Sequence, residues 1–211
     1  LFDSIKNGDK EEFKTLVSEL NTATQYEDLA NQMLSKPVPW FFIDKFGEQA
    51  LDKYSQFKMY MARKFKVNAI NISLGGSAWL GYSLSPKKKF KDFDDNSDID
   101  IVIVSEKMFN LFWNCYLKEL TQGTLRGTIY DNISKNIFKR FIDYKADSCL
   151  NISQTFYVRF QKDINGYAKD LQINYDFPSN IGYRIYKSWE DYEANVIHNL
   201  KDLHEEMKKC Q

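Results

Sequence analysis

One eight-residue run, Ser97-Asp98-Ile99-Asp100-Ile101-Val102-Ile103-Val104, restricts the folds open to this chain more than any other segment. A run so rich in Ile and Val predicts a buried β-strand. Side chains alternate along a strand with a period of two residues, so Asp98 and Asp100 fall on one face and the three isoleucines on the other. The fold must therefore contain a sheet that accepts two neighbouring carboxylates on one face.

The two aspartates require a positive partner. Two like charges 4 Å apart repel by about 4 kcal/mol at an effective dielectric constant of about 20. The partner that such carboxylates most often hold is a hard divalent cation, which prefers oxygen ligands. Upstream, Gly75-Gly76-Ser77 predicts a tight turn whose backbone N–H groups can approach a phosphate. Together the two segments predict a metal-dependent site for a nucleoside triphosphate.

Composition excludes several classes of protein. The 211 residues are 43% hydrophobic and 16% aromatic, which is typical of a folded chain. Its 29 basic and 29 acidic residues cancel, so any contact with nucleic acid depends on local patches. No apolar run approaches the roughly 18 residues of a membrane span, and no signal-peptide pattern begins the chain, so no membrane insertion is expected. Three widely spaced cysteines, Cys115, Cys149 and Cys210, favour a reduced, cytoplasmic protein.

Helical periodicity surrounds the acidic strand. Apolar residues recur at steps of three and four in three stretches, which predict amphipathic helices: residues 13–20, 48–65 and 109–120. A last helix is expected to begin at Ser188, where Asp191 provides an N-terminal signal, and to run to Met207.

The glycine turn has structure predicted on both sides. A short strand is expected at residues 67–74, and a helix is expected to begin near Ala78. Residues 85–96 are polar, contain Lys87-Lys88-Lys89 and predict an exposed, mobile loop. The lysines are a solvated loop or a source of positive charge at the mouth of the site.

Residues 152–186 allow two interpretations. Apolar residues up to Leu171 fit a helix, but residues 171–175 also alternate with polar ones, as in a strand. We favour a helix followed by an extended segment and a strand at 181–186. The expected fold is α/β (α+β), a small mixed sheet wrapped by several helices, with a helical region at 1–66 packed on a core at 67–211.

The order of these motifs resembles the nucleotidyltransferase superfamily of the DNA polymerase β type. In that family a glycine–serine turn that begins a helix precedes a strand with Asp-x-Asp. The matching residues here are Gly76-Ser77 and the pair Asp98 and Asp100. Residues 76–83, followed by the Ser-Asp-Ile-Asp run, are similar to small stand-alone bacterial members, some of which belong to phage-defence operons. Residues 183–189 fit the same group more weakly.

The resemblance implies a polymerase-β-like core, a substrate and cofactors. Asp98 and Asp100 would share two Mg²⁺ (or Mn²⁺) ions, and Gly75, Gly76 and Ser77 would hold the triphosphate of an NTP or dNTP. A hydroxyl acceptor on a nucleotide, nucleic acid or protein would attack the α-phosphate and release pyrophosphate. An effector protein encoded nearby is a further expected partner.

Active members of the family carry a third carboxylate on a later strand. A strand at 181–186 contains no acid, whereas a strand at 171–175 would have Asp170 and Asp176 at its ends. The sequence therefore leaves the third acid unassigned.

Three functions remain open. The chain is an active nucleotidyltransferase that makes a nucleotide or oligonucleotide signal in bacterial antiphage defence, a toxin or antitoxin enzyme that modifies tRNA or protein, or a degenerate module that binds a nucleotide or a partner without catalysis.

Overall fold

The acidic strand predicted from the sequence is present as β2 (Ile99–Val104) in the computed structural model, which describes residues 9–145 and 152–209. β2 belongs to a four-stranded sheet of order β1-β2-β4-β3, whose other strands are β1 (Ile72–Gly75), β3 (Phe141–Lys145) and β4 (Ile181–Tyr186). β4 is parallel to β2 and antiparallel to β3. The described chain is therefore a mixed α+β structure with a small mixed sheet, as the sequence predicts at this coarse level.

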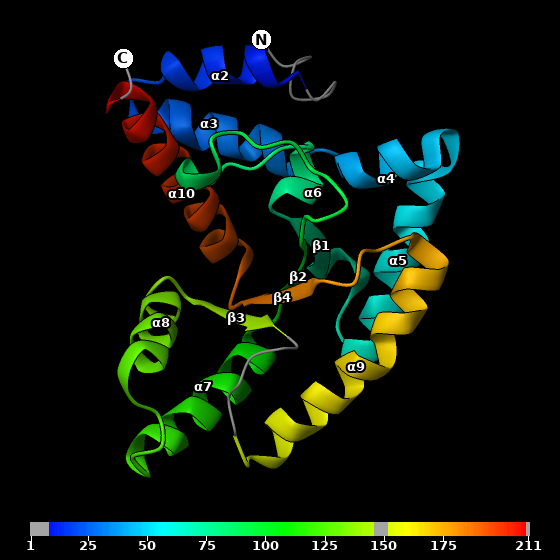
Figure 1. Cartoon of the computed structure of the whole chain (residues 1–211), viewed down its shortest axis with the longest axis vertical. Coiled ribbons are helices and arrows are strands. Elements are labelled where there is room, and N and C mark those ends of the chain that lie inside the picture. The colour runs from blue at the N-terminus through cyan, green and yellow to red at the C-terminus, as the bar shows by residue number, and fades with distance from the viewer. Residues whose placement is uncertain (1–8, 146–151, 210–211) are drawn as a thin grey trace. The chain divides into compact units, whose positions relative to one another are not determined.

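Helices make up most of the remaining structure (Figure 1). Their bounds are α2 (Lys10–Ser18), α3 (Ala23–Leu34), α4 (Trp40–Phe46), α5 (Ala50–Phe65), α6 (Ser77–Leu80), α7 (Glu106–Thr121), α8 (Gly127–Phe138), α9 (Thr155–Tyr175) and α10 (Trp189–Lys209). Three single 3₁₀ turns are η1 (Gly47–Gln49), η2 (Ala69–Asn71) and η3 (Pro86–Lys88). None of the described helices is long and apolar enough to cross a membrane.

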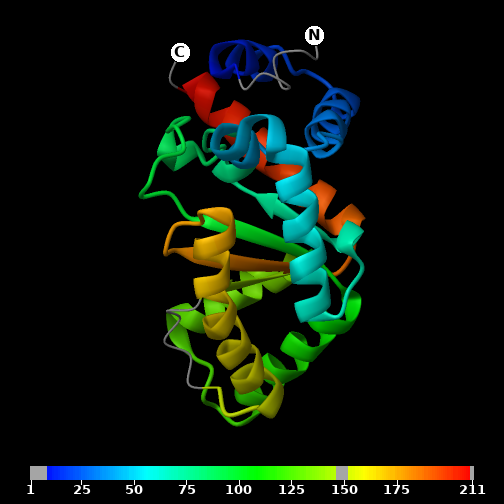
Figure 2. The same cartoon turned by 90° about the vertical axis from the view of Figure 1, so that its right-hand side faces the viewer.

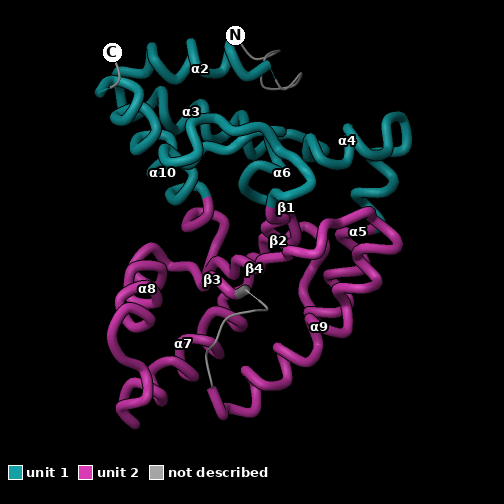
Figure 3. Tube along the Cα trace, viewed as in Figure 1, with its two compact units in different colours: residues 1–56, 74–97, 193–211 teal, residues 57–73, 98–192 magenta. Residues whose placement is uncertain are grey.

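The chain divides into two compact units, coloured separately in Figure 3. Unit 1 comprises residues 1–56, 74–97 and 193–211, and unit 2 comprises residues 57–73 and 98–192. Each unit is thus assembled from stretches that are separated in the sequence.

The sheet in unit 2 has one apolar face. Ile99, Ile101 and Ile103 of β2 are fully buried there, and their neighbours from β3 and β4 include Tyr144 and Tyr183. α7 and α9 cover this face, since the ring of Phe112 lies 6.1 Å from that of Tyr144 and the ring of Phe160 lies 6.0 Å from that of Tyr183. Burial of each large apolar side chain contributes about 1.5 to 3 kcal/mol, so the face anchors the strand that carries the aspartates.

α9 also packs against the second half of α5, which belongs to the same unit (Figure 2). Phe65 stacks on Phe160 with ring centres 5.7 Å apart, and Phe57 lies edge-on to Tyr175 at 5.6 Å. The Tyr60 hydroxyl donates to the Asp170 carboxylate at 2.6 Å. These contacts hold α9 in place beside the sheet.

The core of unit 1 forms around aromatic side chains of the segment between the glycine turn and β2. Phe13 of α2 lies 5.5 Å from the ring of Tyr82 and 6.4 Å from that of Phe90. Trp40 and Phe41 of α4 lie 5.8 and 5.7 Å from the ring of Phe93. The segment predicted as an exposed loop is therefore attached to the core through buried rings.

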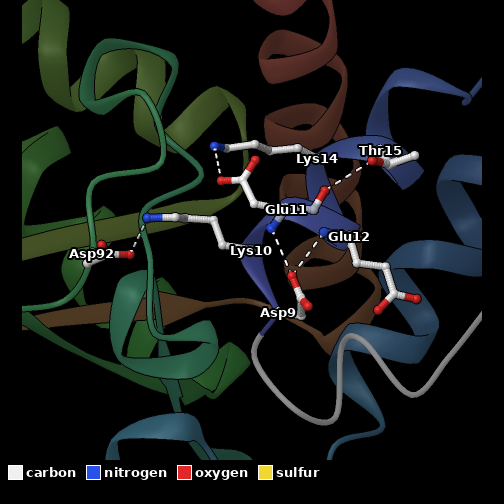
Figure 4. A network of polar contacts seen from close by, with 7 residues as sticks. All are labelled: Asp9, Lys10, Glu11, Glu12, Lys14, Thr15 and Asp92. Atoms are coloured by element: carbon white, nitrogen blue, oxygen red, sulfur yellow. Dashed lines mark hydrogen bonds and ion pairs between the residues drawn. The ribbon is translucent and has the colours of Figure 1, made fainter.

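Polar contacts at the start of α2 attach the same segment a second time (Figure 4). Asp9 caps α2 and accepts the backbone N–H groups of Glu11 and Glu12, each at 3.0 Å. Lys10 then forms an ion pair of 2.6 Å with Asp92. The cap fixes the first turn of the helix and so presents Lys10 to the loop.

The stronger periodic segments are confirmed as helices α2, α5, α7 and α10, and the strand at 181–186 is confirmed as β4. The strand alternative for residues 171–175 is wrong, because α9 runs through Tyr175. The expected strand at 67–74 is shorter and later, since η2 precedes β1. Of the cysteines, Cys115 is buried with a free thiol, whereas Cys149 and Cys210 lie outside the described residues.

Candidate functional site

The two aspartates lie at the start of β2. Asp98 directly precedes the strand, is half-buried, and accepts a hydrogen bond from the side-chain amide of Asn180. The backbone of the same asparagine accepts the N–H of Ile99 at 3.0 Å, so Asn180 fixes both the strand and the carboxylate beside it. Asp100 lies two residues later, inside β2, and its side chain is only 12% exposed. One carboxylate is therefore accessible and the other lies inside.

Arg184 of β4 supplies the positive charge that Asp100 requires. Its Nη2 lies 3.0 Å from Oδ2 of Asp100. Asp143 of β3 is the direct neighbour of Arg184 in the sheet, so the guanidinium comes from the strand between two acidic strands. Burial opposes the charge on Arg184, but Asp100 and Asp143 raise its pKa above the usual value for arginine. The guanidinium is therefore permanently charged, and Asp100 has a protein partner that the sequence does not reveal.

The guanidinium keeps one unused donor. Nε of Arg184 is buried and has no hydrogen-bond partner among the described residues. Tyr186, two residues along the same face, is also buried, and this burial raises the pKa of its hydroxyl to about 12 although Arg184 opposes the shift. A buried N–H without a partner costs about 1 to 3 kcal/mol, so an anionic or carbonyl oxygen brought close to Arg184 would be stabilised.

Gly182 of β4 makes room for the Asp100 carboxylate. The two residues are direct neighbours in the parallel pair of strands. A Cβ atom at position 182 would lie 3.0 Å from Oδ1 of Asp100, closer than side-chain carbons normally approach. Glycine inside a strand commonly marks such a close approach. The carboxylate therefore owes its position both to Arg184 and to the missing side chain at 182.

The glycine turn forms as the sequence predicts. β1 ends at Gly75, Gly76 has φ +60° and ψ −146°, which only glycine adopts easily, and α6 begins at Ser77. Gly76 is exposed and Ser77 is half-buried, whereas Gly75 is buried at the end of β1. Trp79 of α6 holds the helix that follows the turn in place, because its indole N–H donates to the carbonyl of Met33 in α3 at 2.8 Å.

The predicted site residues are divided between the two units. Asp98 and Asp100 belong to unit 2, whereas Gly75, Gly76 and Ser77 belong to unit 1. Within unit 2 the structure places the two aspartates at the start of β2, an interior strand of the sheet. Lys87, Lys88 and Lys89 also belong to unit 1 and are exposed, at and just after η3.

Neither sequence candidate for the third carboxylate lies on a strand. Asp170 is on α9 and accepts the Tyr60 hydroxyl, and Asp176 ends that helix with a left-handed backbone. The acid that shares the sheet face is Asp143, which the sequence reading missed because it did not predict β3. The only signal was the short alternation Ile142-Asp143-Tyr144-Lys145. Asp143 is separated from Asp100 by β4 and Arg184, and the described residues contain no group of three or more His, Cys, Asp or Glu suited to a metal ion.

The carboxylates present nevertheless suit one kind of cation. Mg²⁺ usually keeps several waters and binds through one or two carboxylates together with substrate phosphates. Asp98 and Asp100 meet that requirement without a third acid, provided that Asp100 loosens its ion pair.

Comparison with protein-family models, curated proteins and solved structures finds no match to the chain.

Proposed function

We propose that this chain is a metal-dependent nucleotidyltransferase that transfers a nucleoside monophosphate from an NTP or dNTP to a hydroxyl acceptor. The observation that carries the proposal is the pair Asp98 and Asp100 on one face at the start of a buried strand, after a strand–glycine–helix turn. The accessible Asp98 and the enclosed Asp100 offer oxygen ligands to a divalent cation that also contacts phosphate.

The groups at the site divide the binding of the nucleotide and of the cation between them. Ser77 and the backbone amides around Gly75 and Gly76 hold the outer phosphates, and Asp98 and Asp100 hold Mg²⁺ or Mn²⁺. The cation, when bound, neutralises negative charge on the triphosphate. Arg184 balances the negative charge of Asp100 when the cation is absent.

The reaction is an in-line displacement at the α-phosphorus. A bond forms between the acceptor oxygen and phosphorus while the bond from phosphorus to the bridging oxygen of pyrophosphate breaks. Pyrophosphate leaves with that electron pair, and the hydroxyl proton passes to water. Positioning and charge neutralisation supply most of the rate in such reactions. The product is a nucleotide or oligonucleotide signal of bacterial antiphage defence, and the alternative acceptor is tRNA or a protein hydroxyl.

A second candidate is a nucleotide-binding or partner-binding module without catalysis. The Asp100–Arg184 pair favours it, because the aspartate already has a permanent cation from the protein. The position of Asp143 beyond Arg184 favours it as well, since no third carboxylate among the described residues joins Asp98 and Asp100.

The experiment incubates the protein with each α-labelled NTP and dNTP, with Mg²⁺ or Mn²⁺, and follows product and pyrophosphate. Asp98→Asn and Asp100→Asn are compared with Asp163→Asn, which removes a half-exposed acid of α9 that pairs with Arg159. We expect at least a hundredfold loss of turnover in the first two variants and none in the third.

The molecule that receives the label distinguishes the candidate functions. A discrete product from nucleotides alone indicates signal synthesis, and label on added tRNA or lysate protein indicates the toxin or antitoxin activity. Nucleotide binding by equilibrium dialysis without turnover, unchanged in Asp98→Asn and Asp100→Asn, would reject the enzyme and support the binding module.

A further inference from the structure

The helix α8 is amphipathic, and the described residues cover its apolar side only in part. Among the described residues of unit 2, α8 contributes apolar side chains at helical spacing, namely Ile129, Tyr130, Ile133, Ile137 and Phe138, yet none of its twelve residues is buried. Ile129 is 44% exposed and Phe138 is 89% exposed. Helices of this length gain most of their stability by burying such a face against another element. The apolar side of α8 is therefore available for a contact.

A groove lies between α7 and α8, which follow each other in unit 2 and both contribute side chains to its walls (Figure 1). We call it the α7–α8 groove, and its volume is about 900 Å³. From α7 it is lined by Trp113, Leu117 and Leu120, each more than 40% exposed. α8 supplies Ile133 and Phe138 on the other side. The twelve residues of α8 span about 18 Å, so the groove offers three turns of helix for contact.

The surroundings of the groove carry more positive than negative charge. Arg140 and Lys187 are the charged residues that line it among those that the structure describes, and they pair with Asp191 at 3.3 Å and with Glu106 at 3.4 Å. Residues 106–140 contain six basic and three acidic side chains, in a chain whose overall charge is zero. One of the three acids, Glu119, is buried and accepts the Thr124 hydroxyl at 2.6 Å. The groove therefore attracts negative charge and opposes a second copy of its own basic surface.

We propose that the α7–α8 groove is the docking site for an acidic amphipathic helix of a partner protein. Recognition of this kind places apolar residues at spacings of three and four into a hydrophobic groove. Trp113 and Phe138 provide the large apolar contacts, and the excess of basic side chains in residues 106–140 attracts the carboxylates of the partner helix. The proposal does not depend on nucleotidyl transfer, because its residues are separate from Asp98 and Asp100.

The probe is a synthetic, fluorescently labelled 18-residue helical peptide with leucines on one face and glutamates on the other. Its matched control carries lysines in place of the glutamates. Fluorescence anisotropy with the full chain is expected to give at least tenfold tighter binding for the acidic peptide, with affinity falling as salt is added.

Variants locate the binding. Phe138→Asp and Leu117→Asp are expected to weaken binding at least tenfold, and both side chains are exposed, so the fold is retained. Ile173→Asp, which changes a 70% exposed apolar residue of α9, is expected to bind like the wild type. Circular dichroism checks that all three remain folded.

Three outcomes would overturn the proposal. They are no binding of either peptide, equal or tighter binding of the lysine peptide, and binding that Phe138→Asp and Leu117→Asp leave unchanged. Light scattering adds a fourth, since a dimer that dissociates in Phe138→Asp would assign the groove to a second copy of the chain.

Discussion

The ion pair between Arg184 and Asp100 determines how the acidic strand is stabilised. Both side chains are largely enclosed, at 30% and 12% exposure, so removing either partner leaves a poorly solvated charge. The pair also competes with any cation for Asp100. Because Arg184 stays protonated at every physiological pH, only a ligand that offers more charge can release the carboxylate.

Arg184→Gln is expected to lower the free energy of unfolding by about 1 to 3 kcal/mol, because Asp100 loses its charged partner while remaining enclosed. In the variant, Mn²⁺ is expected to restore part of the melting temperature and to shift it more than in the wild type. Thermal denaturation with and without Mn²⁺ measures both effects.

Arg159→Gln is the matched control, since Arg159 is 75% exposed and its ion pair with Asp163 measures 3.8 Å. This substitution should lower the free energy of unfolding by no more than about 0.5 kcal/mol. Equal losses in the two variants would contradict the special role of Arg184, and a melting temperature insensitive to Mn²⁺ would show that the released Asp100 does not bind the cation.

At this scale the sequence predicts one side of the site and misses the other. Alternation along a single strand is enough to place Asp98 and Asp100 on one face, because that property is local. Arg184 and Asp143 reach Asp100 only through strand pairing, which joins residues distant in the sequence. No local pattern specifies that register.

The elements vary in how well their own sequences specify them. β2 and α7 have strong periodic patterns and form where predicted. β3 is only five residues long and depends on β4, so its weak alternation gave no strand prediction. Residues 171–175 alternate like a strand but belong to α9, whose packing on α5 overrides the local pattern.

A contact between α3 and α10 makes unit 1 sensitive to pH. Nδ1 of the buried His204 lies 2.5 Å from the Tyr26 hydroxyl, and its Nε2 has no hydrogen-bond partner among the described residues. Burial, assisted by Lys208, lowers the pKa of His204 against the opposing effects of the Ser18 backbone and of Glu205. The folded state therefore binds the proton less readily than the unfolded state, in which the pKa is about 6.5.

Stability from this contact is complete above about pH 6.5 and decreases as the pH falls toward the lowered pKa of folded His204. The melting temperature of the wild type should therefore fall as the pH is lowered from 7.5 to 5. The melting temperature of His204→Gln should fall less over the same range. His198→Gln removes a partly exposed histidine of the same helix that lies 3.4 Å from Asp202, and it should retain the wild-type dependence of melting temperature on pH. If all three proteins lose stability equally, His204 is not the group responsible.

At the scale of the whole molecule, each unit is built from stretches of chain that lie far apart in the sequence. Unit 2 takes residues 57–73 from before the glycine turn and residues 98–192 from after it. The first stretch contributes the rings of Phe57 and Phe65, which contact α9, and Phe65 also lies 5.9 Å from the ring of Tyr183. Residues 98–192 alone therefore lack part of their own core.

A fragment of residues 57–192 is expected to melt cooperatively and to give a near-ultraviolet circular dichroism signal from packed aromatic rings. A fragment of residues 98–192 should lack both, because it loses the second half of α5. The inserted residues 74–97 act as a loop in the longer fragment and cost little to close. A cooperative transition of equal midpoint in the shorter fragment would contradict this dependence.

The close fit of Gly182 against Asp100 carries an evolutionary consequence. Any other residue at 182 brings a carbon atom to about 3.0 Å from the carboxylate, which must then shift relative to Arg184. Drift at one of the three positions should therefore be followed by compensating change at the others. Descendants of this chain should keep or lose Asp100, Gly182 and Arg184 as an inherited set, and Gly-x-Arg beside Asp-x-Asp becomes the signature by which such descendants can be identified.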